Sequence, residues 1–369
     1  MKITIAKEQL LNGLQAVQNV VGSRTTLPIL SNVLLNARAD RLELTATDLD
    51  VTISCSVPAT VLSEGAATIP VKKLFSIARE LGAPEIELET DEKHSCSVRA
   101  GASFYRINGL AAEDYPPMPQ FQRNRQVVVP QEKLRTMLRR TSFAVSTDET
   151  RFVLNGIFFS LKEHKMTLVA TDGRRLALTD GDVEVPVDSQ ADFIVPTKAI
   201  NELNRLLTDK GNMELKFSEN QAAFTLIAEN GFNIVIITKL VDGNYPNYRQ
   251  VIPAEPQERV ALPREEFLHA LRRAELMTSE KSNSVKLAFT RNNLRITANT
   301  PDLGEAQENL AINYKGKDLA IAFNPVYMMD PLKALENDEI FLELIDELSP
   351  GVVKVTEPFL YVIMPMRMS

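Results

Sequence analysis

Apolar residues recur at helical spacing in three segments, each of which opens a similar stretch of the chain. The first segment covers residues 7–21, where Leu10 and Leu14 lie one turn apart, and the others cover residues 131–142 and 264–275. Positions three or four residues apart fall on one face of a helix. The pattern therefore predicts an amphipathic helix in each segment.

Strand-like residues follow each predicted helix, and a second helix comes after them. Residues 42–46 and 285–289 alternate in the way of half-buried strands. The second helices are predicted at residues 71–81, 197–207 and 325–336. Each has a proline at or just before its first residue, where a missing N–H costs least. Further strands, separated by turn residues, close each stretch.

The same order of elements occurs three times, which indicates an internal repeat. The run LTATD ends at Asp48, and LVATD ends at Asp172, 124 positions later. A weaker copy, RITANTPD, ends at Asp302. Proline-rich joints at residues 116–126 and 246–258 cannot continue a helix or a strand ladder, so they separate the copies.

The repeat predicts an α+β protein of three tandem, similar domains, with the limits 1–124, 127–254 and 257–369. Each domain is expected to pack two helices on one face of an antiparallel sheet. A chain of 369 residues is too long for one ordinary core, which agrees with several domains.

Composition places the chain among globular proteins, with 44% hydrophobic and 24% charged residues. No apolar run approaches the roughly 20 residues of a membrane-spanning helix, and the N-terminus lacks the apolar core of a signal peptide. Cys55 and Cys96 both lie in strand-like runs, so we expect buried free thiols in a reducing cytoplasm. A disulfide between them is the alternative that the sequence leaves open.

Charge is distributed unevenly between the predicted helices and the rest of the chain, whose net charge is −7. The six helical segments contain fourteen basic and nine acidic residues, a net +5, so the remainder carries −12. If the polar stripes of the helices line one surface, that surface is basic and suits a duplex nucleic acid, which presents a phosphate charge about every 1.7 Å. The alternative is that these residues lie on ordinary solvated helix faces.

No catalytic, metal-binding or nucleotide-binding motif is recognisable in the sequence. The three histidines lie in unrelated contexts, and Gly316-Lys317 lacks the other residues of a phosphate-binding loop. Asp48 and Asp172 invite comparison with a catalytic carboxylate pair, but turns at matching strand ends suit them better. We therefore expect no enzyme activity, no catalytic residue, no cofactor and no metal.

Several segments resemble the bacterial β sliding clamp family (the DNA polymerase III β subunit), in the family's order and over nearly the whole chain. These segments are TLPILSNVLL around Leu27, LNG at Leu154, ATDGRRLA from Ala170, KLVDGNYPNYRQVIP from Lys239 and the terminal YVIMPMRM. The resemblance implies a clamp fold of three domains and a head-to-tail homodimer. It implies that the dimer closes as a ring around double-stranded DNA, without regard to base sequence, as a processivity factor.

The resemblance also implies three sets of functional residues. A peptide-docking pocket between the second and third domains would contain Leu154, Thr171, Gly173, Arg174, Arg175, Leu176, Pro246, Gln250, Val251, Val362, Ile363, Met364, Pro365, Met366 and Arg367. DNA contacts would involve Arg24, Lys72, Asp148, Arg151, Phe152 and Val153, together with the basic helix residues Lys198 and Arg205. The dimer seam would bring Tyr105 of one subunit against Leu276 and Met277 of the other.

The partners implied by the resemblance are replicative polymerase subunits, an ATP-dependent clamp loader and other proteins with clamp-binding peptides; no membrane is implied. Arg174 and Gln250 occupy positions where the family often differs, and Asp148 is an acid in a loop expected to face DNA. Two other classes of function remain open from the residues alone. One is a peptide-binding scaffold that never encircles DNA, and the other is a hydrolase with a cleft between domains.

Overall fold

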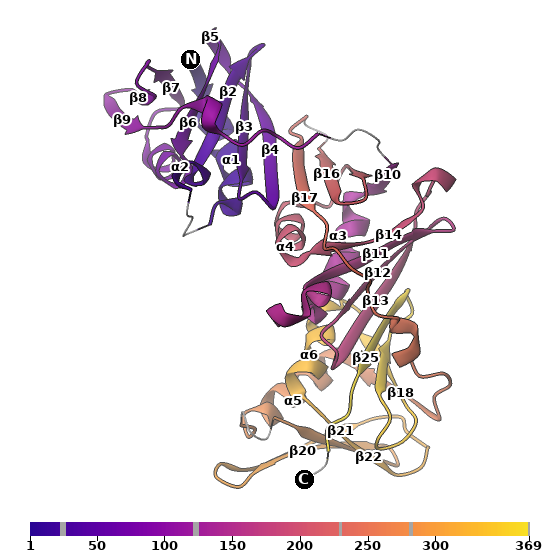
Figure 1. The fold of residues 1–369 in the computed structure, drawn as a ribbon. Helices are drawn as coiled ribbons and strands as arrows, with labels where there is room; N and C mark the ends of the chain where they lie inside the picture. Colours follow the sequence, from indigo (N-terminus) through magenta and orange to yellow (C-terminus); the bar gives the residue numbers. More distant parts are fainter. Residues whose placement is uncertain (23–26, 121–124, 229–230, 280–282, 368–369) are drawn as a thin grey trace. The chain divides into compact units, whose positions relative to one another are not determined.

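The computed structural model describes residues 1–22, 27–120, 125–228, 231–279 and 283–367. These residues form two compact units. Figure 1 shows their helices and strands, coloured along the sequence. Unit 1 consists of Met1–Arg135, Val183–Ser189 and Lys198–Leu240. Unit 2 consists of Thr136–Asp182, Gln190–Thr197 and Val241–Ser369.

Unit 1 contains two helices of its own and most of a third. Its helices are α1 (Lys7–Val17), α2 (Val71–Glu80) and, after its first residue, α4 (Thr197–Leu206). Its strands are β1 (Lys2–Ala6), β2 (Asn32–Arg38), β3 (Arg41–Thr47), β4 (Val51–Pro58), β5 (Thr60–Ser63), β6 (Gly65–Pro70), β7 (Glu85–Thr90), β8 (Ser95–Ala100), β9 (Ser103–Asn108), β10 (Arg125–Pro130), β15 (Asn212–Phe217), β16 (Gln221–Ile227) and β17 (Ile234–Lys239). Its short 3₁₀ turns are η1 (Gln18–Val20), η2 (Pro28–Ser31), η3 (Ala112–Asp114) and η6 (Val187–Ser189).

Unit 2 contains α5 (Arg264–Glu275) and α6 (Pro325–Ala334), and α3 (Gln131–Thr141) runs from unit 1 into it. Its strands are β11 (Gly156–Lys162), β12 (Lys165–Thr171), β13 (Arg175–Asp182), β14 (Ala191–Pro196), β18 (Glu258–Pro263), β19 (Val285–Thr290), β20 (Asn293–Thr300), β21 (Gly304–Ala311), β22 (Leu319–Phe323), β23 (Glu339–Leu344), β24 (Gly351–Lys354) and β25 (Phe359–Ile363). Its 3₁₀ turns are η4 (Ser142–Ala144), η5 (Glu149–Leu154) and η7 (Tyr248–Val251).

The order of elements repeats three times, so the predicted repeat is confirmed. Each copy runs through a strand and helix, three strands, another strand and helix, and three final strands; the first copy adds the short β5. All six predicted helices are present. Helix α1 ends at Val17 rather than at the predicted Val21, and a 3₁₀ turn follows, in keeping with the β-branched Val20 and Val21 and with Gly22.

Two eight-stranded sheets organise the structure, and each is shared by two copies of the repeat. In unit 1 the order is β10-β15-β16-β17-β4-β3-β2-β6, and in unit 2 it is β14-β11-β12-β13-β25-β24-β23-β18. The copies meet where β4 pairs with β17 and where β13 pairs with β25, both antiparallel. The compact units cross the predicted domain limits for this reason, because a shared sheet binds half of one domain to the next.

The helices cover one face of the sheets through the apolar stripes that the sequence predicts. Leu10, Leu14 and Val17 of α1 are buried, and α1 contacts α2 and β4. In unit 2, α5 buries Phe267 and Leu271 and contacts α6. Burying a large apolar side chain stabilises a fold by about 2 kcal/mol, so these stripes hold the two layers together.

A largely buried arginine, Arg175, whose side chain is 10% exposed, joins β13 to α6 in unit 2. The Arg175 guanidinium donates to Asp330 at 2.5 Å, to Asp172 at 3.1 Å and to the Phe143 carbonyl at 2.6 Å. It also lies over the Tyr327 ring at 4.3 Å from the centroid. A buried charge without partners is costly, so the loss of any one residue of this network would destabilise the fold.

Both cysteines are free and buried, as the sequence predicts, and burial raises the pKa of each thiol to about 12. The thiolate is the reactive form. We therefore expect iodoacetamide at pH 8 to modify Cys55 and Cys96 far more slowly in the folded protein than in 8 M urea, as measured by intact mass. Equal rates in the two conditions would contradict the burial.

Replacement of Arg175 by Met should lower the free energy of unfolding by about 3 kcal/mol, because the Asp172 and Asp330 carboxylates lose their buried partner. Urea denaturation followed by circular dichroism measures this change. Arg174→Met is the matched control, since Arg174 is exposed next to Arg175, and its effect should stay within about 0.5 kcal/mol. Equal losses from the two variants would refute the network's importance.

Candidate functional site

The turn between β12 and β13 is built around Asp172, the anchor of the second repeat. Its Oδ1 accepts from the backbone N–H groups of Arg174 at 2.9 Å and Arg175 at 3.0 Å. Gly173 has φ +85°, a conformation that glycine adopts at little cost. The prediction that Asp48 and Asp172 are turn residues is confirmed, because Asp48 Oδ1 accepts in the same way from Asp50 and Val51.

An apolar cluster lies on the face of the unit 2 sheet that points away from the helices. Leu176 and Val362 are directly opposite each other on β13 and β25, and Val362 is opposite Val352 on β24. These three side chains and Val169 form a buried core cluster. Residues on one strand alternate between faces, so Tyr361, whose hydroxyl donates to the Tyr327 carbonyl of α6, marks the opposite, helix-covered face. We call the four residues the outer-face cluster.

Residues 241–257, which we call the strap, cover part of this cluster. Tyr245, Tyr248 and Ile252 of the strap pack against it. The Tyr245 ring stacks on Phe158 of β11 at a centroid distance of 5.0 Å, and its hydroxyl donates to the Val169 carbonyl at 3.4 Å. Burial raises the pKa of Tyr245, so this hydroxyl keeps its proton.

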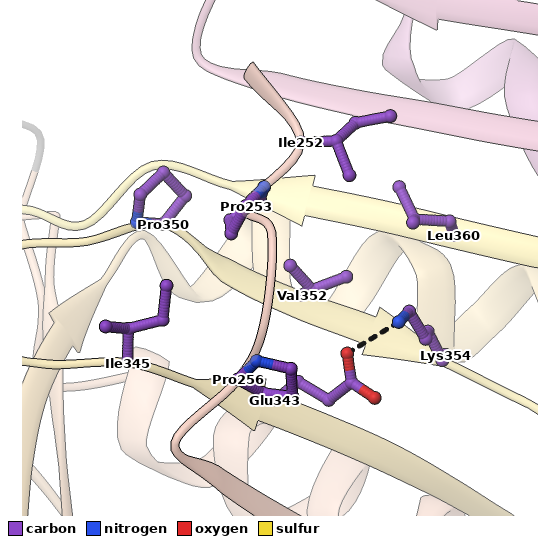
Figure 2. A pocket seen from close by; sticks show the side chains of 9 residues that line it. All are labelled: Ile252, Pro253, Pro256, Glu343, Ile345, Pro350, Val352, Lys354 and Leu360. Carbon is purple, nitrogen blue, oxygen red and sulfur yellow. Dashed lines mark ion pairs between the residues drawn. The ribbon is translucent and has the colours of Figure 1, made fainter. Parts of the chain in front are cut away.

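The strap continues over β23 and β24, where it closes a small pocket (Figure 2). Ile252, Pro253 and Pro256 line it from the strap, together with Val352 of β24 and Leu360 of β25. Two charged residues also line the pocket: the Glu343 carboxylate forms an ion pair with the Lys354 ammonium group at 2.7 Å. The sheet face therefore changes from apolar at β13 and β25 to charged at β23.

Most of the predicted docking residues belong to the outer-face cluster (Leu176, Val362), to the strap (Pro246, Gln250, Val251) or to the chain directly next to β13 and β25, and two are exceptions. Leu176, Val362 and Leu154 are buried. The exposed set is Gly173, Arg174, Pro246, Gln250, Val251, Met364, Met366 and Arg367, and Thr171 and Pro365 are half-buried. The exceptions are Ile363 and the Arg175 guanidinium: Arg175 is opposite Ile363 in the ladder and reaches α6, so both lie on the helix-covered face. We leave these two side chains out of the docking surface.

The sequence prediction missed two residues of the cluster, Val169 and Val352, and three strap residues that pack against it, Tyr245, Tyr248 and Ile252. One signal was available for Tyr245. A Tyr-Pro pair opens both proline-rich joints, at Tyr115 and Tyr245, and the two hydroxyls donate to the carbonyls of Thr45 and Val169, which are 124 positions apart. The others are ordinary apolar residues until the sheet brings them together.

The loop predicted to face DNA lies beside the predicted docking residues. Asp148 and Arg151 line the same pocket as Arg174 and Arg175. Arg151 donates to the Asp172 carbonyl at 3.3 Å, and a Cβ on Gly173 would lie 2.9 Å from its guanidinium. Phe152 and Val153 continue this loop, and Phe152 is exposed. Two sets of residues that the sequence treats separately are therefore contiguous.

The predicted DNA-contacting residues on helices differ in whether other residues of the protein already bind their charged groups. Lys72 is exposed on α2. Lys198 forms an ion pair with Asp48, and Arg205 donates to Glu202 and to the Gln15 and Ala16 carbonyls of α1. Arg24 lies outside the described residues.

Ion pairs moderate the positive charge that the sequence assigns to the helices. Eight of the fourteen basic residues pair with carboxylates of the described residues: Arg79, Arg135, Arg139, Lys198, Arg205, Arg264, Arg273 and Lys333. The helices thus present a weaker positive field than the count of basic residues suggests.

The predicted dimer residues lie at sheet edges. Tyr105 is on β9, the last strand of the sheet β5-β1-β7-β8-β9 of unit 1. Leu276 and Met277 follow α5, next to β21, the last strand of the sheet β21-β20-β19-β22 of unit 2; the Met277 carbonyl accepts from Thr300 at 2.7 Å. No helix among the described residues is long and apolar enough to cross a membrane, and no cluster of three potential metal ligands occurs among them.

Comparison with known families matches nearly the whole chain in three consecutive parts. The N-terminal, central and C-terminal domains of the DNA polymerase III beta subunit match residues 1–119, 128–247 and 249–367. The chain therefore consists of three tandem domains of one family, as the repeat predicts.

Similar proteins and structures agree with this match. The Beta sliding clamp of Chlamydia pneumoniae is 35% identical over 368 residues, which cover 100% of this chain and 99% of that protein. The Beta sliding clamp of Escherichia coli K12 is 34% identical, with both chains covered completely. The crystal structure of a DnaN sliding clamp from Bartonella birtlesii bound to griselimycin has a TM-score of 0.94 and 35% identity, again over both whole chains. This chain belongs to the DNA polymerase III beta subunit family, the beta sliding clamps.

Proposed function

We propose that this protein is a processivity factor whose two copies join head to tail into a ring around duplex DNA. The observation that carries the proposal is a rule of strand pairing. The third strand after the first helix of one domain pairs with the last strand of the next domain, as β4–β17 and β13–β25 show. In the third domain the corresponding strand is β21, which is an edge strand. In the first domain the final strand is β9, which is also an edge strand. The rule therefore predicts that β21 pairs with β9 of a second copy.

Both of these edges carry exposed apolar side chains. On β9, Phe104 is 54% and Tyr105 43% exposed, and beside β21, Leu276 is 75% and Leu303 54% exposed. An open sheet edge with apolar side chains invites pairing with another chain. A second copy that places its β9 on β21 repeats the junction a third time. Because the two edges differ, the contact is heterologous, and such a contact forms a ring when its rotation closes.

The charge of the helices supports a loose association with DNA. Phosphate contacts position a protein without reading sequence, and many strong contacts would oppose sliding. Exposed ion pairs contribute little to stability, about 0–1 kcal/mol each, but they reduce the charge available to phosphates. Retention of the protein on DNA therefore comes from the closed ring, and Lys72, which is exposed on α2, adds a diffuse attraction. Arg24, Lys198 and Arg205 remain predictions in this role.

Partners dock on the outer-face cluster and its exposed rim. Leu176 and Val362 supply an apolar floor, and Met364 and Val251 supply a rim that adapts to different side chains, since methionine is flexible and polarisable. Short apolar peptides of polymerase subunits, of a clamp loader and of other replication and repair proteins fit such a surface. We expect griselimycin, which is bound in the structures of two related clamps, to bind here.

The protein itself carries out no reaction in this proposal. Opening of the ring requires the energy of ATP, which a separate clamp loader supplies. The protein acts in the cytoplasm, where its partners copy the chromosome.

Retention on circular DNA tests the ring. After an ATP-dependent clamp loader has placed the protein on a nicked circular plasmid, gel filtration should show it co-eluting with the DNA. Cutting the plasmid once with a restriction enzyme should release it, because a ring slides off a free end. Equal retention on the circle and the linear form would contradict encirclement and support plain surface binding.

A variant with charged edges controls this experiment. Tyr105→Asp combined with Leu276→Asp should sediment as a monomer at micromolar concentration and should not be retained on either DNA. Leu348→Asp is the matched control, because Leu348 is 78% exposed in the loop between β23 and β24 and belongs to neither edge strand. A stable monomer of the unmodified protein would also overturn the dimer.

A change at the rim tests the docking surface. Met364→Ala combined with removal of the residues after Pro365 should weaken griselimycin at least tenfold in calorimetry, because the rim loses its apolar contacts, while sedimentation stays that of the dimer. Met118→Ala is the matched control, since Met118 is 42% exposed and Met364 is 44% exposed. Unchanged affinity of the Met364 variant would count against the docking surface.

A further inference from the structure

The junction of the first two domains reproduces the backbone of the docking site. At β13–β25, Leu176 is opposite Val362, and Met364 N–H donates to the Arg174 carbonyl at 3.0 Å. At β4–β17, Thr52 is opposite Ile237, and Lys239 N–H donates to the Asp50 carbonyl at 3.1 Å. The two strand pairs therefore have the same register.

The turns beside these strands also have the same hydrogen bonds. The Thr171 hydroxyl donates to the Arg175 carbonyl at 2.6 Å and accepts from Gly173 N–H at 3.1 Å. The Thr47 hydroxyl donates to the Val51 carbonyl at 3.1 Å and accepts from the N–H of the next residue but one, Leu49, at 3.1 Å. The φ angles of Gly173 and Leu49 are +85° and +77°. A leucine at this point of the turn is thus compatible with the backbone.

Side chains on the floor distinguish the two junctions. The positions of Val169, Leu176 and Leu178 in unit 2 are taken in unit 1 by Thr45, Thr52 and Ser54. These hydroxyls are bonded within the sheet: Thr52 to Thr47 at 2.8 Å, and Thr45 to Ser54 at 3.0 Å. Thr52 is already buried, but Thr45 and Ser54 are half-buried. An apolar ligand on this floor would remove the hydroxyls of Thr45 and Ser54 from water and give them no new partner, which is unfavourable.

The residues at the rim of the β4–β17 junction also disfavour an apolar ligand. The positions of Arg174 and Met364 in unit 2 are taken in unit 1 by Asp50 and Lys239, which form an ion pair at 3.2 Å. Leu49 places an exposed side chain where Gly173 has none. An apolar ligand would therefore have to displace a leucine and break or desolvate an ion pair.

We propose that the β4–β17 junction is a second, silenced copy of the docking site. Leu49 at the turn, the hydroxyl pairs on the floor and the Asp50–Lys239 ion pair keep it from binding the peptides that dock at β13–β25. Each chain consequently offers one docking site although it contains two junctions of equal backbone geometry. This inference rests on the proposed docking function of the outer-face cluster.

Reciprocal substitutions with griselimycin as the probe test the inference. In calorimetry the unmodified protein should bind one griselimycin per chain. Gly173→Leu should weaken binding at least tenfold, because the leucine silences the site as Leu49 does; the Arg151 guanidinium that it meets is exposed and can move. Gly231→Leu is the matched control: the φ of Gly231 is +78°, and a Cβ there meets no atom of the described residues within 4 Å, so the change imposes the same backbone strain elsewhere.

The silenced copy can then be opened in the Gly173→Leu background. The set of changes is Thr45→Val, Leu49→Gly, Asp50→Arg, Thr52→Leu, Ser54→Leu and Lys239→Met. If circular dichroism shows a folded chain, one site per chain should return. A folded six-fold variant that does not bind griselimycin overturns the inference. A Gly173→Leu variant that binds griselimycin as tightly as the Gly231→Leu control also overturns it. If the six-fold variant does not fold, the comparison of Gly173→Leu with Gly231→Leu decides the test.

Failure of the proposed docking function would look different. In that case the unmodified protein would not bind griselimycin, or Met364→Ala with the shortened terminus would bind it unchanged. Binding by the unmodified protein that is lost in the Met364 variant but kept in Gly173→Leu would leave the docking function intact and refute only the silenced copy.

Discussion

Pairing between the third strand after the first helix of one domain and the last strand of the next domain is the interaction on which the rest of this structure depends. It joins half of each domain to its neighbour in a continuous sheet, as at β4–β17 and β13–β25. Backbone hydrogen bonds set the register of such a joint, and a slip of one residue would move every side chain to the other face. The joint therefore fixes which residues of two domains share a surface.

The outer-face cluster is a direct product of that register. Leu176 and Val362 come from different domains and meet only because β13 and β25 are adjacent. Arg175, next to Leu176 on the same strand, faces the other way and ties the joint to α6. One strand thus supplies both a residue of the proposed docking surface and an anchor beneath it, in keeping with the alternation of side chains along a strand.

Electrostatics in this chain favour mobility over a tight grip. The helices are richer in basic than in acidic residues, but at least eight of the fourteen cations form ion pairs with carboxylates that the structure describes. A net charge of −7 keeps the remaining surface acidic, which opposes nonspecific adhesion to nucleic acid. A protein that has to stay on DNA and yet slide along it benefits from this weak field, because encirclement replaces affinity.

The sequence by itself determined the local elements and their threefold order. Helical spacing and alternation depend on residues close together in the chain, so all six helices and the turns at Asp48 and Asp172 could be predicted. Tertiary structure alone decided that Val169 and Val352 join Leu176 in one cluster, that Ile363 lies on the opposite face, and that Lys198 and Arg205 are held by neighbours. The physical reason is that strand register and ion pairing bring together residues far apart in sequence, and no local pattern records those partners.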